Sequence, residues 1–172
     1  MINNDVLRRV RYIFDFGDDK MMALFGLADH QVTREEISDW LKKEDDPAFV
    51  ECNDVELAIF LNGLINDQRG KREGAAPEPE QRLTNNSIFM KLKIALNLKA
   101  EDILEIMELA DFVMSKHELS AFFRKAGHKH YRVCQDQILR NFLQGLQIKH
   151  RGRGEEKSAF EWKKAPEVPG ES

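Results

Sequence analysis

The stretch FLNGLINDQRG runs from Phe60 to Gly70, and a close copy, FLQGLQIKHRG, runs from Phe142 to Gly152. The two stretches lie 82 positions apart, and this offset aligns residues 3–70 with 85–152 without a gap, with 17 of the 68 pairs identical. An internal repeat of this kind indicates a duplicated structural unit. Because two copies are too few for a solenoid, we expect a pair of units related by a pseudo-two-fold axis.

Each copy predicts four helices. Apolar residues recur at helical spacing in residues 6–14 and 21–28 and in their counterparts one repeat later. Asn4 and Asn86 precede the first helix of each copy and are expected to be its N-cap residues. Because the sequence shows no strand-like alternation, it predicts an all-α protein of two tandem four-helix repeats.

The third and fourth helices have their own start signals. Thr33-Arg34-Glu35-Glu36 and its counterpart Ser115-Lys116-His117-Glu118 have the pattern of a capping box. Cys52 and Cys134 precede the fourth helices and are spaced for a hydrophobic staple. We therefore expect both cysteines to be unpaired and mostly buried beside these helices.

Gly63 and Gly145 occupy equivalent positions inside the fourth helices. Glycine in a helix costs about 1 kcal/mol relative to alanine, so finding it in both copies favours a close approach of backbones. We expect the two fourth helices to meet at these glycines, across the interface between the repeats. Simple tolerance of a glycine is the alternative.

Composition divides the chain into four segments. Residues 1–70 form the first repeat, 71–84 a linker rich in Pro, Gly and Glu, and 85–152 the second repeat. Residues 153–172 are poor in apolar residues and are predicted to be a disordered tail. The sequence has neither a signal-peptide pattern nor an apolar run of membrane-spanning length. We therefore expect a cytoplasmic protein that does not bind membranes.

The stretches NNDVLRRVRYIF (3–14), MMALFGLADHQVTREEISDWLKKEDDPAFVECND (21–54) and FLNGLINDQRGKREG (60–74), with their counterparts in the second half, resemble the YehS-like family. This family consists of small bacterial proteins with two tandem copies of an uncharacterised domain. The resemblance covers most of residues 1–152 and implies the same duplicated architecture. It implies no activity, and no catalytic residue can be carried over from it.

The sequence carries no recognised catalytic signature, so we expect a protein that is not an enzyme. The stretch GHKHYRVC (127–134) contains three candidate zinc ligands, His128, His130 and Cys134. The equivalent positions of the first copy hold Asp46, Ala48 and Cys52, of which only the cysteine is a usual zinc ligand. We therefore expect neither a metal nor another cofactor.

Charge separates the two copies. Residues 3–70 hold 8 basic and 15 acidic side chains, a net charge of −7, whereas residues 85–152 hold 11 basic and 7 acidic side chains, a net charge of +4. This asymmetry indicates an acidic partner for the second copy. We expect Lys116, Arg124 and Lys125 to lie on the outer side of the third helix. The full set of predicted partner-binding residues is Lys116, Arg124, Lys125, Lys129, Arg132 and Arg151.

Our leading hypothesis is a non-enzymatic adaptor or regulator that binds another macromolecule, with an unidentified protein as the expected partner. The alternative is a DNA- or RNA-binding regulator, since helices two and three resemble a helix-turn-helix, although the turn between them is too long for the usual motif. An acidic first copy and a net charge of −4 are atypical of nucleic-acid binders. Opposite charges also allow the two halves, or two molecules in a homo-oligomer, to attract each other. An enzyme of unrecognised type is the third alternative.

Overall fold

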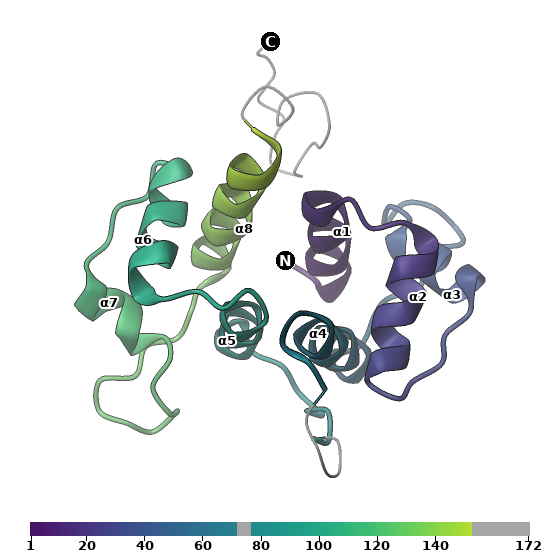
Figure 1. Cartoon of the computed structure of the whole chain (residues 1–172), viewed down its shortest axis with the longest axis horizontal. Helices are drawn as coiled ribbons and strands as arrows, with labels where there is room; N and C mark the ends of the chain where they lie inside the picture. Colours follow the sequence, from purple (N-terminus) through teal and green to yellow (C-terminus); the bar gives the residue numbers. More distant parts are fainter. Residues whose placement is uncertain (72–76, 153–172) are drawn as a thin grey trace.

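The computed structural model describes residues 1–71 and 77–152, and every regular element within these ranges is a helix. The first repeat consists of α1 (Asn3–Phe14), α2 (Asp18–Leu27), α3 (Arg34–Leu41) and α4 (Asp54–Arg69) (Figure 1). The second consists of α5 (Asn85–Ala95), α6 (Ala100–Leu109), α7 (Lys116–Ala121) and α8 (Asp136–Arg151). The predicted all-α fold of two tandem four-helix repeats is confirmed. The predicted disordered tail, residues 153–172, and linker residues 72–76 lie outside the described residues.

The third helices begin at the predicted capping boxes. The Thr33 hydroxyl accepts from the Glu36 amide at 3.0 Å, and the Glu36 carboxylate accepts from the Thr33 amide at 2.8 Å. Ser115 and Glu118 repeat both bonds at 3.0 and 2.8 Å. These pairs satisfy two otherwise orphaned amides at each helix start.

The prediction that Asn4 and Asn86 are N-cap residues is wrong. The N-caps of α1 and α5 are Ile2 and Thr84, and both asparagines lie inside the helices and are buried. Their side chains turn away from their own helix and hydrogen-bond the loop that precedes the fourth helix. An asparagine near a helix start reads as a cap from sequence, but a buried amide can instead satisfy distant backbone groups.

Aromatic rings fill the core of both repeats. Phe25 and Phe60 lie with their ring centroids 5.4 Å apart, and Phe89 and Phe142 lie 4.7 Å apart. All four side chains are fully buried. Burial of each such side chain stabilises the fold by roughly 1.5–3 kcal/mol.

The glycines of the fourth helices do allow a close approach of backbones, but the predicted location of that approach is wrong. A Cβ placed on Gly63 would lie 2.7 Å from the carbonyl carbon of Leu24 on α2. A Cβ on Gly145 would lie 2.8 Å from the carbonyl carbon of Ile106 on α6. Both glycines therefore pack α4 and α8 against the second helix of their own repeat, not against each other.

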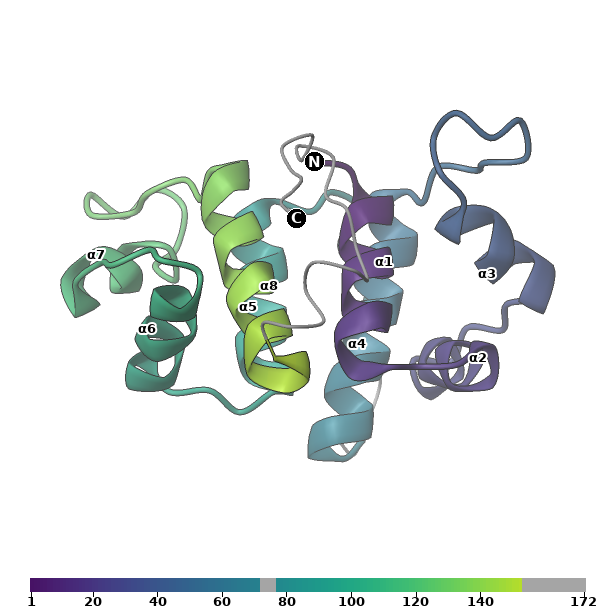
Figure 2. The same cartoon turned by 90° about the horizontal axis from the view of Figure 1, so that it is seen from above.

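The repeats join through their first and fourth helices. α4 packs along α5, and α1 packs along α8. α5 and α8 are the counterparts of α1 and α4, 82 residues later in the chain. The contact of α1 with α8 is therefore related to the contact of α5 with α4 by the pseudo-two-fold axis. Figure 2 shows these four helices in the middle of the molecule, with α2 and α3 at one end and α6 and α7 at the other.

Two equivalent polar contacts cross this interface. Arg9 is fully buried on α1, and its guanidinium donates to Gln147 at 2.7 Å and also to Gln144, both on α8. One repeat later, Lys91 on α5 donates to Asn62 on α4 at 2.7 Å. A buried cation requires such hydrogen-bond partners, because its desolvation would otherwise be costly.

Among the described residues, no helix is both long and apolar enough to cross a membrane.

Candidate functional site

Four of the six predicted partner-binding residues lie on the loop that joins α7 to α8. We call residues 122–135 the basic loop, and these four are Arg124, Lys125, Lys129 and Arg132. The prediction placed Arg124 and Lys125 on the third helix, but α7 ends at Ala121, so both belong to the loop. Lys125, Lys129 and Arg132 are exposed, and Arg124 is half-buried.

The other two predicted cations are engaged elsewhere. Lys116, at the start of α7, forms an ion pair with Glu101 at 2.9 Å. The hydrogen bond from Lys116 holds the pKa of the Glu101 carboxyl below its ordinary value. Arg151 lies 4.1 Å from the ring centroid of Tyr12 and donates to the Tyr12 carbonyl at 3.1 Å. Because Tyr12 is on α1, Arg151 belongs to the contact between the repeats and not to the basic loop.

The basic loop has the same hydrogen-bonded backbone as its counterpart in the first repeat, residues 40–53. Three loop amides donate to equivalent carbonyls in both repeats, at 2.9 to 3.2 Å. These donors are Asp46, Phe49 and Val50 in the first repeat and His128, Tyr131 and Arg132 in the second. The two loops therefore share these turns, but they differ at Gly127, whose φ of +99° is not repeated at the equivalent Asp45.

Their charges are opposite. Residues 42–51 hold two basic and four acidic side chains, whereas residues 124–133 hold four basic side chains, two histidines and no acid. The backbone bonds that shape the loop do not depend on these side chains. The fold therefore accepts either sign of charge at this position, and in the second repeat the sign is positive.

Asn86 holds the basic loop in place. Its amide nitrogen donates to the carbonyls of Phe122 at 3.0 Å and Arg132 at 2.8 Å, and its oxygen accepts from the amide of Cys134 at 2.9 Å. These partners stand near the two ends of the loop, so one buried side chain closes it. Asn4 makes the same three bonds in the first repeat. This role was not predicted from the sequence, although the presence of the asparagine in both copies was the available signal.

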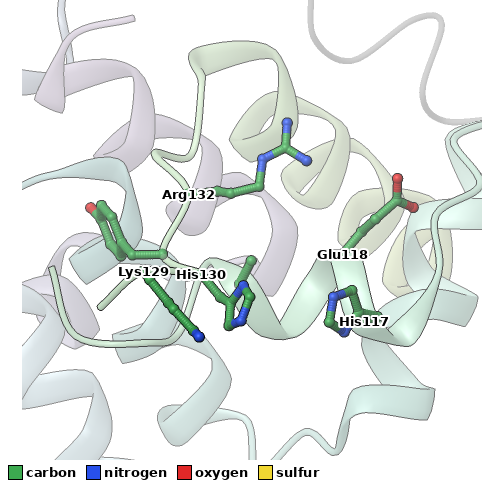
Figure 3. Close-up of a pocket in the computed structure, with 7 residues that line it drawn as sticks. His117, Glu118, Lys129, His130 and Arg132 are labelled. Atoms are coloured by element: carbon green, nitrogen blue, oxygen red, sulfur yellow. The ribbon is translucent and has the colours of Figure 1, made fainter. Parts of the chain in front are cut away.

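A shallow pocket of about 250 Å³ lies between α7 and the basic loop. It is lined by His117, Glu118, Ala121, Lys129, His130, Tyr131 and Arg132. Figure 3 shows His117, His130 and Lys129 along one side of the pocket, with the Arg132 guanidinium directed away from them. The polar groups of α7 and of the loop therefore meet in one surface depression.

The histidines and cysteine of this region do not form a metal centre. Cys134 is buried and its Sγ lies 3.7 Å from the carbonyl oxygen of Gln135, while His128 and His130 are exposed on the loop. Burial raises the pKa of the Cys134 thiol to about 12, which opposes the thiolate form that binds zinc. Within residues 1–71 and 77–152, no three ligand side chains are placed to hold a metal ion.

Both cysteines are free, and both are buried beside the starts of α4 and α8. Burial raises the pKa of the Cys52 thiol as well, and Glu56 and Asp54 add to the effect because an anionic thiolate is repelled by their charges. Neither thiol is therefore placed to act as a nucleophile.

Comparisons with known proteins agree with the duplication. The model of the family described as "Protein of unknown function (DUF1456)" matches residues 3–70 and again residues 85–152. The chain is 46% identical over 147 residues to "Uncharacterized protein YehS" of Escherichia coli (strain K12), covering 85% of this chain and 94% of that protein. No solved structure matches significantly. The chain therefore belongs to the DUF1456 family and contains two tandem copies of its domain.

Proposed function

We propose that this protein is a non-enzymatic adaptor or regulator that binds an acidic segment of a partner protein through the basic loop. One observation carries the proposal: two loops that share three backbone hydrogen bonds have opposite charge, and the positive one gathers four cations without an acid. Charge complementarity across an interface selects partners and accelerates association. A largely exposed loop whose charged side chains are all positive is suited to that role.

The shape of α7 argues against the helix-turn-helix alternative. This helix has six residues, so it spans only about 9 Å at the helical rise of about 1.5 Å per residue. Lys116, the cation at its start, is already paired with Glu101. These features favour a protein partner over a nucleic acid.

The loops provide a matched test, because the aligned segments have equal length and share three backbone hydrogen bonds. In the exchange variant, residues 124–133 take the sequence of residues 42–51 except at Gly127, so that RKAGHKHYRV becomes KKEGDPAFVE. Gly127 is kept because its φ of +99° would strain another residue. A charge-reversal variant carries Lys125→Glu, Lys129→Glu and Arg132→Glu. Its control reverses three exposed lysines outside the loop, Lys43, Lys99 and Lys149.

Each variant is immobilised and incubated with bacterial extract, with and without nuclease treatment, and captured proteins are identified by mass spectrometry. We expect the wild-type protein and the control variant to capture the same acidic protein, and both loop variants to lose it. The circular dichroism of all variants should be unchanged, since exposed substitutions usually alter stability by only about 0.5 kcal/mol. Equal capture by the loop variants would contradict the proposal. Capture that disappears on nuclease treatment would favour the nucleic-acid alternative.

A further inference from the structure

The pocket beside the basic loop gathers hydrogen-bond donors from two segments. His117 comes from α7, and Lys129 and His130 come from the loop (Figure 3). The ring centroids of His117 and His130 lie 6.4 Å apart, with the rings edge to face. An anion in this pocket, beside the edges of the rings, can therefore accept from an N–H of each imidazole and from the lysine ammonium.

One acid lines the pocket, and its carboxylate is already engaged. Glu118 accepts from the Ser115 amide at 2.8 Å as part of the α7 capping box. Hydrogen bonds from Ser115 are the main reason that the pKa of Glu118 is lowered, and the nearby charges of Arg132 and His117 contribute further. The Glu118 carboxylate is thus engaged by Ser115, while the neighbouring Glu101 is paired with Lys116. The side of the pocket that carries His117, Lys129 and His130 therefore presents two imidazoles and one ammonium.

Comparison with the first repeat shows that the fold does not require these donors. The residues equivalent to His117, Lys129 and His130 are Glu35, Pro47 and Ala48. His128 replaces Asp46 but keeps its structural role: its Nδ1 accepts from the His130 amide at 3.0 Å, as the Asp46 carboxylate accepts from the Ala48 amide at 2.8 Å. The turn is therefore preserved while its negative charge is removed.

We propose that this pocket binds the phosphoryl group of a phosphorylated side chain in the partner protein. This inference rests on the proposed function and specifies the chemistry of the same surface. A phosphomonoester carries a charge of about −1.5 to −2 and three acceptor oxygens, which matches two imidazoles and an ammonium. A carboxylate has two oxygens and a single charge, so it leaves part of this donor set unused.

The test uses the full-length protein and three fluorescent peptides of identical acidic sequence that differ at one central position. This position holds phosphoserine, glutamate or serine, and affinity is measured by fluorescence anisotropy. We expect the phosphoserine peptide to bind at least tenfold more tightly than the glutamate peptide. The variant His117→Ala/His130→Ala should lose this preference and retain the affinity for the glutamate peptide within twofold. Lys149→Ala, an exposed lysine outside the pocket, is the control and should retain the preference.

The outcomes separate this inference from the proposed function. Equal affinity for the phosphoserine and glutamate peptides overturns the phosphoryl site and leaves the acidic-partner proposal standing. Absence of binding to all three peptides overturns both. A preference that survives in the double histidine variant places the phosphoryl group elsewhere and overturns the assignment to this pocket. A single-stranded oligonucleotide that binds more tightly than the phosphoserine peptide also overturns it, because the loop then recognises phosphodiesters.

Discussion

Replacing Gly63 by alanine tests the packing of α4 against α2. The added Cβ would lie 2.7 Å from the carbonyl carbon of Leu24 and still closer to its oxygen. Both atoms belong to the backbone of a helix, so no flexible side chain can move to make room. The two helices must separate, which also loosens the contacts of neighbouring core residues.

Two opposing effects determine how much Gly63→Ala changes the free energy of unfolding. Overpacking a well-packed core costs about 1–3 kcal/mol, and contact with backbone belongs at the upper end of that range. Alanine in place of glycine within a helix recovers about 1 kcal/mol. We therefore expect Gly63→Ala to lower the free energy of unfolding by about 2 kcal/mol. For a domain of this size, the loss corresponds to a fall in Tm of about 4–8 °C.

Gly26 supplies the control within the same helix pair. It lies on α2, it is exposed, and a Cβ at this position would have no heavy atom within 4 Å. Gly26→Ala should therefore raise the free energy of unfolding by up to about 1 kcal/mol, because only the helix-propensity term remains. Urea unfolding followed by circular dichroism measures both variants. If Gly63→Ala is as stable as the wild-type protein, the close-packing argument is refuted.

Three further predictions concern buried groups. Asn86→Ala should lower the free energy of unfolding by about 2–4 kcal/mol in urea titrations, because it leaves three backbone groups of the basic loop without a partner; a loss below about 1 kcal/mol would contradict this role. Arg9→Met should cost about 1–3 kcal/mol, since Gln144 and Gln147 lose their donor, whereas Arg9→Lys should cost less because Lys91 makes the equivalent bond in the other half. Burial raises the folded-state pKa of Cys134 to about 12, whereas the pKa of the thiol in the unfolded chain is about 8.5. Below about pH 8.5 the thiol is protonated in both states and its contribution to the free energy of unfolding is fully present. Above this pH the thiol ionises only in the unfolded chain, so the free energy of unfolding falls by at most about 1.4 kcal/mol per pH unit. Cys134→Ala should therefore reduce the fall in Tm between pH 8 and pH 10, and an unchanged fall would show that the thiol does not ionise on unfolding.

Local signals in the sequence predicted most of the fold. Capping boxes and apolar periodicity depend on neighbouring residues, so Thr33 and Ser115 marked helix starts that the structure reproduces. The partner of a helix face is a long-range property that periodicity does not contain. The fourth helices are apolar on several sides, and sequence could not tell which side the glycines face. Gly63 consequently packs against α2, whereas the prediction had placed it at the interface between the repeats.

The candidate site was predicted in part for the same reason. Counting charges located the basic segment, because exposed cations remain visible in a sequence. It could not identify which cations are engaged within the molecule, as Lys116 is by Glu101 and Arg151 by Tyr12. Nor could it show that Asn86 closes the loop, since its partners are backbone groups 36 to 48 residues away.

The arrangement of the repeats bears on the source of the acid that the basic loop would meet. The acidic and basic loops follow α3 and α7, which stand at opposite ends of the molecule, so they do not meet within one chain (Figures 1 and 2). Between two molecules, a contact of basic loop with acidic loop would be head-to-tail. Each copy added in that way presents a further unoccupied loop, and a contact of this type assembles open filaments unless its rotation happens to close a ring. An acidic segment of a different protein occupies the loop without such growth. The opposite charges of the two ends therefore support a foreign partner more strongly than self-association.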